Sequence, residues 1–206
     1  NNLGHVVGIV SSGGEGRFEA IPASHIFRLI KQTEVEPTLK YDHIGKAVRE
    51  CILMLEKMHR TSPDSTELAA VLSIEKICSQ TTNRQLYDLA ASEIGKNGFP
   101  KIATKLFKKS LSEDQNAINS RIGLLVSLSI SMEYEKMLHH IRWFLNHNID
   151  DLQVLRLGIQ SGTWGGDTAL AKEAFSRLAN FNPAIASTAE NFLKNPPPRP
   201  RPRPKN

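Results

Sequence analysis

The chain of 206 residues contains 40% apolar and 23% charged residues, which is typical of a soluble protein with room for one sizeable core. The net charge is +5, but Arg199, Arg201, Arg203 and Lys205 supply +4 of it, so residues 1–198 carry about +1. The composition therefore excludes a broad basic face on the body of the protein and disfavours nucleic-acid binding. No run approaches about 18 apolar residues, so we expect no membrane span.

The first patterned stretch, residues 4–26, predicts a β-hairpin. Residues that favour strands stand on both sides of a glycine-rich turn at residues 13–16. These residues are Val6, Val7, Ile9, Val10 and Phe18. Two strands alone are marginal in water, and the rest of the sequence predicts no further strand. The hairpin therefore belongs to a larger sheet or forms an arm on a helical protein.

Two motifs in this stretch carry a family resemblance. The first reads Val7-Gly8-Ile9-Val10-Ser11-Ser12-Gly13, and the second reads Phe18-Glu19-Ala20-Ile21-Pro22. Over residues 3–32 they resemble the last strand pair of trypsin-like serine peptidases of the HtrA-like branch. In that family a Val-x-Gly-Ile-x-Ser strand follows the nucleophile motif, and a Phe-Ala-Ile-Pro strand and a helix, here from about residue 23, come next. Glu19 is an insertion relative to the second motif.

The resemblance implies a role in binding substrate. The backbone of Ser11, Ser12 and Gly13 would pair with an extended substrate, and Gly13 and Gly16 would line the mouth of the specificity pocket. The family places its catalytic His, Asp and Ser before this segment, so no catalytic residue is expected here. Residues 1–33 would then be the C-terminal fragment of a trypsin-like peptidase domain. The missing N-terminal half would be its partner, and the chain alone is expected to be inactive.

From about residue 41 the apolar residues recur at steps of three and four, which predicts helices. The residue types also recur at a constant spacing of about 34 residues, a length typical of helix-pair repeats. The recurring positions are Ala103, Met137 and Ala171, then Phe107, Ile141 and Phe175, and before them the turn positions Gly98, Met132 and Gly166. Such a period predicts a solenoid of helix pairs. An irregular helical bundle with a chance period is the alternative.

These positions resemble the second helix of the tetratricopeptide repeat, which carries Ala-x3-Phe and ends near a proline such as Pro183. The first helix departs from the family, because Tyr87 and Ile94 stand where Trp and Tyr are usual. We expect a mainly α fold, in which a tetratricopeptide-like solenoid at residues 41–194 follows a β-hairpin that is the remnant of a trypsin-like β-barrel. The expected units are residues 50–83, 84–117, 118–151 and 152–185, with a capping helix at 184–194.

The tetratricopeptide resemblance also implies a concave groove, lined by the first helices, that binds an extended peptide or protein segment. The family's groove positions fall mostly on amide and hydroxyl side chains, which can hydrogen-bond a peptide backbone. They are Gln85, Asp88, Ser92, Asn119, Val126, Gln153, Arg156 and Gln160. A solvated face without a ligand is the alternative. Trp164, in the turn after the third of these helices, either anchors a ligand or packs against the preceding unit.

The remaining features predict no metal site and no cofactor. Cys51 and Cys78 lie on apolar helical stretches and are expected to be buried reduced thiols, with a disulfide as the alternative. His139 and His140 point about 100° apart on a helix, so they cannot share an ion. Residues 195–206 alternate Pro with Arg, which predicts an extended, disordered tail. Docking of this tail on an aromatic groove or an acidic surface is the alternative.

Two functions are compatible with these patterns. In the first, the chain is the C-terminal portion of a trypsin-like serine endopeptidase whose repeat domain recruits substrates or regulators. In the second, it is a non-enzymatic adaptor that binds extended peptides. The HtrA-like branch is often exported and tetratricopeptide fusions are often cytosolic, so the two resemblances favour different compartments. We favour the cytoplasm.

Overall fold

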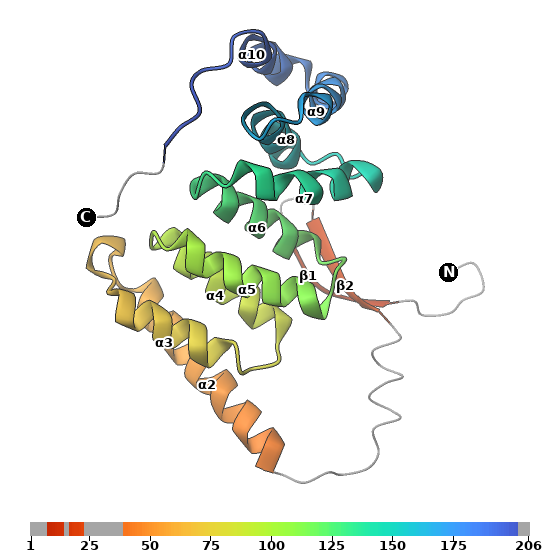
Figure 1. The fold of residues 1–206 in the computed structure, drawn as a ribbon. Helices are drawn as coiled ribbons and strands as arrows, with labels where there is room; N and C mark the ends of the chain where they lie inside the picture. The colour runs from red at the N-terminus through yellow and green to blue at the C-terminus, as the bar shows by residue number, and fades with distance from the viewer. Residues whose placement is uncertain (1–7, 15–16, 23–38, 202–206) are drawn as a thin grey trace, which may run out of the picture. The chain divides into compact units, whose positions relative to one another are not determined.

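A computed structural model describes the backbone of residues 8–14, 17–22 and 39–201 and the side chains of residues 42–201. The chain divides into two compact units, Asn1–Ile44 and Gly45–Asn206 (Figure 1). The first unit contains two strands and the start of a helix that begins at Leu39, and the second unit contains the rest of that helix and all the later ones. No helix among the described residues is both long enough and apolar enough to cross a membrane.

The two strands form an antiparallel hairpin. Strand β1 (Gly8–Gly14) pairs with β2 (Arg17–Pro22) along its whole length. The register shifts by one residue between Val10 and Ser12, so Ser11 is the extra residue of a β-bulge. No third strand lies in the part of the chain that the structure describes. Membership of a trypsin-like barrel therefore stays a prediction. Gly16 and the helix expected from about residue 23 lie outside the described residues.

The second unit is built of helices that follow one another in pairs. They are α2 (Leu39–His59), α3 (Leu68–Cys78), α4 (Arg84–Lys96), α5 (Pro100–Glu113), α6 (Ile118–Ile130), α7 (Tyr134–Asn146), α8 (Leu152–Trp164), α9 (Thr168–Phe181) and α10 (Pro183–Lys194), with a 3₁₀ turn at Pro63–Ser65. The starts of α4, α6 and α8 are evenly spaced, and those of α5, α7 and α9 follow at the same period. The expectation of a mainly helical fold is confirmed. The first pair departs from the period, since α2 begins before residue 50.

One turn geometry joins the helices of each later pair. Gly98, Met132 and Gly166 occupy equivalent positions between the helices, with φ angles of 85°, 59° and 84°. Such a left-handed residue closes the preceding helix, and the N–H of Met132 accordingly donates to the carbonyl of Ser129 at 2.9 Å. Glycine adopts this conformation without strain, whereas methionine does so at a cost. The recurring turn position in the sequence thus has a conformational cause.

Small residues let neighbouring helices approach closely. A Cβ at Gly95 in α4 would lie 3.6 Å from the Cβ of Ala103 in α5, so this contact joins two helices of one pair. Phe107 of α5 packs on α6 at Gly123, where a Cβ would lie only 2.3 Å from the Phe107 ring. The ring itself is 4% exposed and has little space to move. The Ala and Phe of the repeat therefore act in different contacts, one within a pair and one between pairs.

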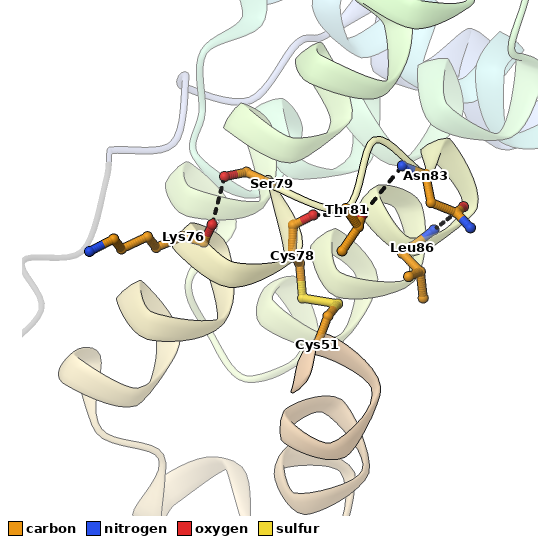
Figure 2. Close-up of a disulfide and its surroundings, with 7 residues drawn as sticks. All are labelled: Cys51, Lys76, Cys78, Ser79, Thr81, Asn83 and Leu86. Carbon is orange, nitrogen blue, oxygen red and sulfur yellow. Dashed lines mark hydrogen bonds between the residues drawn. A yellow bond between two sulfur atoms is a disulfide. The ribbon is translucent and has the colours of Figure 1, made fainter. Parts of the chain in front are cut away.

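A disulfide joins the first helix pair. Cys51 of α2 and Cys78, the last residue of α3, are both fully buried, and their sulfur atoms are bonded (Figure 2). The expectation of reduced thiols is therefore wrong. The helical stripe correctly indicated that each cysteine is buried, but not that α2 and α3 bring the two Cα atoms to 4.9 Å, within bonding reach.

Hydrogen bonds continue from the disulfide to the next helix. The Thr81 hydroxyl donates to the carbonyl of Cys78 at 2.8 Å and accepts from the N–H of Asn83 at 3.3 Å (Figure 2). The Asn83 side chain in turn accepts from the N–H of Leu86 at 3.2 Å and caps α4. The end of α3 is thus fixed both to α2 and to the start of the repeat.

The tail begins as an ordered segment. Residues 195–201 have no regular secondary structure, as their prolines require, but they run back from α10 and contact the earlier pairs (Figure 1). The indole N–H of Trp164 donates to the carbonyl of Pro197 at 3.0 Å, and Arg199 forms an ion pair with Glu135. These contacts correspond to the docked tail that was the alternative to disorder, and residues 202–206 lie outside the described part.

Loss of the disulfide should destabilise the protein. We expect the joint substitution Cys51→Ala with Cys78→Ala to lower the free energy of unfolding by about 3 kcal/mol, because the bond closes a loop of 27 residues in the unfolded chain. Urea unfolding monitored by circular dichroism measures this difference. A reductant should shift the wild-type midpoint by a similar amount and leave the double variant unchanged. Two titratable thiols in the unreduced, unfolded wild type would contradict the bond.

Candidate peptide-binding groove

The groove residues that the sequence predicted form rows across α4, α6 and α8. Gln85, Asn119 and Gln153 occupy equivalent positions, as do Ser92, Val126 and Gln160, with Asp88 and Arg156 between them. Each set spans two turns of its helix, so its members share one face. Asp88, Val126 and Gln160 are half-buried and the other members are exposed. The structure thus places all of them on the accessible side of the first helices.

The first helices of successive pairs form the inner layer of the repeat. Helix α4 packs against α6, α6 against α8 and α8 against α10, whereas the second helices α5, α7 and α9 approach one another less closely. Closer packing on one side curves the stack toward that side. The face that carries the predicted groove residues is therefore the concave one.

A pocket lies at the C-terminal end of this face, between α8 and α10. Its volume is about 440 Å³, and its lining residues are Arg156, Ile159, Gln160, Ala184, Ile185, Thr188, Ala189 and Phe192. Arg156 is exposed at its edge and makes no hydrogen bond or ion pair with any residue that the structure describes. The pocket therefore combines an available cation and an amide with an apolar wall. Of the predicted groove residues, Arg156 and Gln160 are the two that share this pocket.

Asp88 has a structural role. Its carboxylate accepts from the Arg84 guanidinium at 3.1 Å and from the Ser120 hydroxyl at 2.8 Å, and Ser120 is 2.8 Å from the hydroxyl of Ser110. These bonds join α4 to α6 and α6 to α5. Asp88 therefore fixes the spacing of the helices that form the concave face, and its assignment as a ligand-binding residue needs this qualification.

The side of the pocket that α10 provides was not predicted from the sequence. Ile185, Ala189 and Phe192 recur at steps of four and three and line one wall. This spacing was visible in the sequence. A capping helix also needs an apolar face with the same spacing, so the pattern was interpreted as that of a cap. The predicted peptidase residues Ser11, Ser12 and Gly13 lie in β1, where Ser12 and Gly13 pair with β2 and Ser11 is the bulged residue.

A second polar cluster surrounds His140 in the interior of the repeat. The guanidinium of Arg121 is 2.9 Å from His140 Nδ1 and stacks 4.1 Å above the Trp143 ring. Burial, together with the nearby charges of His139, Arg121 and Lys108, lowers the pKa of His140 to about 3. His140 is therefore neutral, and its Nδ1 accepts a hydrogen bond from Arg121.

No group of His, Cys, Asp or Glu able to hold a metal ion occurs among the described residues. The fold and groove define the second unit as a repeat of helix pairs with an accessible inner face. Comparisons of the chain with protein-family models, with curated proteins and with solved structures found no match.

Neutral His140 should make the protein sensitive to mild acid. The unfolded chain takes up a proton at this residue near pH 6.5, but the folded chain does so only near pH 3. Stability should therefore fall as the pH drops below 6.5, by up to about 1.4 kcal/mol per pH unit. His140→Gln keeps an acceptor for Arg121 and removes this proton uptake, so its stability should fall less steeply.

Urea unfolding of both proteins between pH 7 and pH 4 measures the two slopes. His43→Gln, on the exposed surface of α2, controls for the loss of a histidine as such. Parallel wild-type and His140→Gln curves would show that His140 titrates alike in the folded and unfolded states, contrary to this expectation.

Proposed function

We propose that the second unit is a protein-interaction module that binds an extended peptide along the concave face of α4, α6 and α8. The observation that carries this proposal is the pocket between α8 and α10, which places Arg156 and Gln160 beside an apolar wall. The constant period of the helices and of their turns supports the resemblance to tetratricopeptide repeats, whose groove holds peptides in this position.

The chemistry of the pocket specifies the class of peptide. The Arg156 guanidinium can donate two parallel hydrogen bonds to a carboxylate, and the Gln160 amide can both donate to and accept from a peptide backbone. Ile185 and Phe192 offer apolar surface to one side chain. The ligand is therefore an extended peptide that carries an acidic group next to an apolar side chain.

Selection from a random peptide library tests this proposal. Phage-displayed dodecapeptides would be selected on the full chain, and the enriched sequences resynthesised with a fluorescent label. We expect acidic and apolar residues to be enriched together, and Arg156→Ala to weaken binding about tenfold, because a charge-assisted bidentate contact is lost. Fluorescence anisotropy measures the affinities.

A matched substitution separates the site from general charge effects. Arg49→Ala removes an exposed arginine from α2 and should leave the affinity unchanged. Ile185→Asp, which places a carboxylate in the apolar wall, should weaken binding as Arg156→Ala does. Peptides whose affinity is the same for Arg156→Ala, Ile185→Asp and the wild type would refute binding in this pocket.

A second proposal concerns the first unit, which we assign to the C-terminal end of a trypsin-like serine endopeptidase domain. The observation that favours it is that the two motifs of the resemblance form the two strands of one hairpin, with Ser11 bulged in the first strand. In this proposal the repeat domain recruits substrates or regulators to a peptidase whose catalytic residues precede Asn1.

The transcript that encodes the chain tests this assignment directly. We expect a Gly-x-Ser-Gly-Gly motif to be encoded a few codons before Asn1, with His and Asp codons farther upstream. Purified chain beginning at Asn1 should show no hydrolysis of peptide esters, since the triad acts as a unit. A start codon at the Asn1 boundary, or measurable turnover by the chain itself, would reject the assignment.

A further inference from the structure

The C-terminal segment lies in a site built from two turns and α10. The site, here called the tail site, consists of Met132, Tyr134, Glu135, Trp164 and Phe192. Met132 lies in the turn between α6 and α7, Tyr134 and Glu135 begin α7, Trp164 ends α8, and Phe192 lies in α10. Residues from two helix pairs and from the last helix thus meet in one site.

Arg199 occupies this site with most of its donors engaged. Its guanidinium forms an ion pair with both carboxylate oxygens of Glu135, the second at 3.0 Å. It also donates to the carbonyls of Met132 at 3.1 Å and Trp164 at 3.4 Å, and it lies 5.3 Å from the centre of the Tyr134 ring. A forked, planar cation is required to reach a carboxylate, two carbonyls and an aromatic face together, so lysine cannot replace it.

The proline-rich backbone before this arginine is also recognised. The indole N–H of Trp164 donates to the carbonyl of Pro197 at 3.0 Å. An aromatic side chain that donates to a carbonyl of an extended proline-rich segment is a general mode of peptide recognition, because such a segment is already ordered before it binds. The tail site therefore recognises both the backbone of the segment and its charge.

The aromatic side chains of the tail site are themselves held in place. The Trp164 ring packs against Tyr134 at 4.9 Å and edge-on against Phe192 at 5.0 Å. A Cβ at Gly165 would lie 3.3 Å from the backbone of Tyr134 and 2.5 Å from the carbonyl of Ser161, so the absence of a side chain there lets the two turns meet. The rings of the site are thus positioned by contacts among the helices and turns as well as by the tail.

The backbone at Met132 supplies one acceptor of the tail site. Among the three equivalent turn residues, Met132 is the one that is not glycine, and it keeps φ at 59°. This left-handed conformation closes α6, as it closes the first helix at the other two turns. Here the carbonyl of Met132 is an acceptor for Arg199. The hydrogen bonds from Arg199 also lower the pKa of Glu135, in keeping with a charged pair.

We propose that the tail site is a binding site for a proline-flanked arginine segment, and that the chain's own residues 196–200 are its resident ligand. The bound segment closes the site in the free protein. A Pro-Pro-Arg-Pro sequence supplied from outside must therefore compete with the tail for Glu135 and Trp164. The tail site shares Phe192 with the pocket of the peptide groove, but Arg156 and Gln160 take no part in it.

A peptide with the sequence of residues 195–206 is the probe that tests this proposal. Labelled with fluorescein, it would be titrated with the full wild-type chain and with a chain whose own tail is silenced by Arg199→Ala, Arg201→Ala and Arg203→Ala. We expect the silenced chain to bind at least about tenfold more tightly, because its own tail no longer competes. Anisotropy at low ionic strength, repeated at high salt, measures the affinities and their screening.

Further variants in the silenced chain locate the binding. Glu135→Gln should weaken it about tenfold through loss of the bidentate pair, whereas Glu56→Gln, an exposed carboxylate on α2, makes the same change of charge elsewhere and should not. A peptide with lysine in place of arginine should also bind more weakly. Arg156→Ala should leave this affinity intact and so separate the tail site from the groove.

The chain contains two tryptophans, so its indole N–H resonances give a second readout. The Trp164 resonance, assigned with Trp143→Phe, should shift when the tail is silenced and return when the peptide is added. Equal peptide affinity for the wild-type and silenced chains, or an affinity that Glu135→Gln leaves unchanged while circular dichroism confirms a folded protein, would overturn the proposal.

Discussion

The close approach of helix backbones at small residues is the constraint on which the rest of the structure depends. At Gly162 in α8, a Cβ would lie 2.7 Å from both the N–H nitrogen of Ala171 and the carbonyl oxygen of Asp167, so α8 touches the start of α9 directly. Phe107 makes the corresponding approach between pairs, where its ring covers Gly123. In an interior packed this densely, an added methyl group fits only if the helices shift. The concave pocket and the meeting of the turns both depend on this spacing.

The repeat was largely visible in the sequence because its contacts recur at fixed separation. Ala103 and Phe107, with their counterparts one repeat farther along, indicated helix pairs, and the starts of α4 to α9 follow that period. The disulfide could not be derived in the same way. It depends on the angle between α2 and α3, and α2 begins too early to obey the repeat. Periodicity defines which face of a helix is buried, but it leaves open which helix covers that face.

Charged and polar groups in the interior make contacts between units that the consensus positions of the repeat do not indicate. The groove positions of the tetratricopeptide family are defined within a single unit, without regard to its neighbours. On that basis Asp88 was assigned to the ligand-binding residues. In the structure Asp88 and Ser120 hydrogen-bond across the joint between two pairs, and Arg121 meets the neutral ring of His140 within the next pair. A buried polar group needs a partner, and in a solenoid the nearest partner belongs to the adjacent helix or unit. Arg156, on the exposed face of α8, forms no such bond with the described residues and remains available.

The length of the connection from α10 explains why Arg199, and not a later arginine, fills the tail site. Helix α10 ends at Lys194, and Trp164 holds the carbonyl of Pro197, so the backbone is fixed shortly before Arg199. Arg201 lies two positions farther along, which in an extended proline-rich chain is a displacement of about 6 Å. The tether therefore sets one register when the segment belongs to the same chain. A separate Pro-Arg segment has no such tether, so each of its arginines can enter the site. Several possible registers raise the probability of binding, although the contacts in each register are the same.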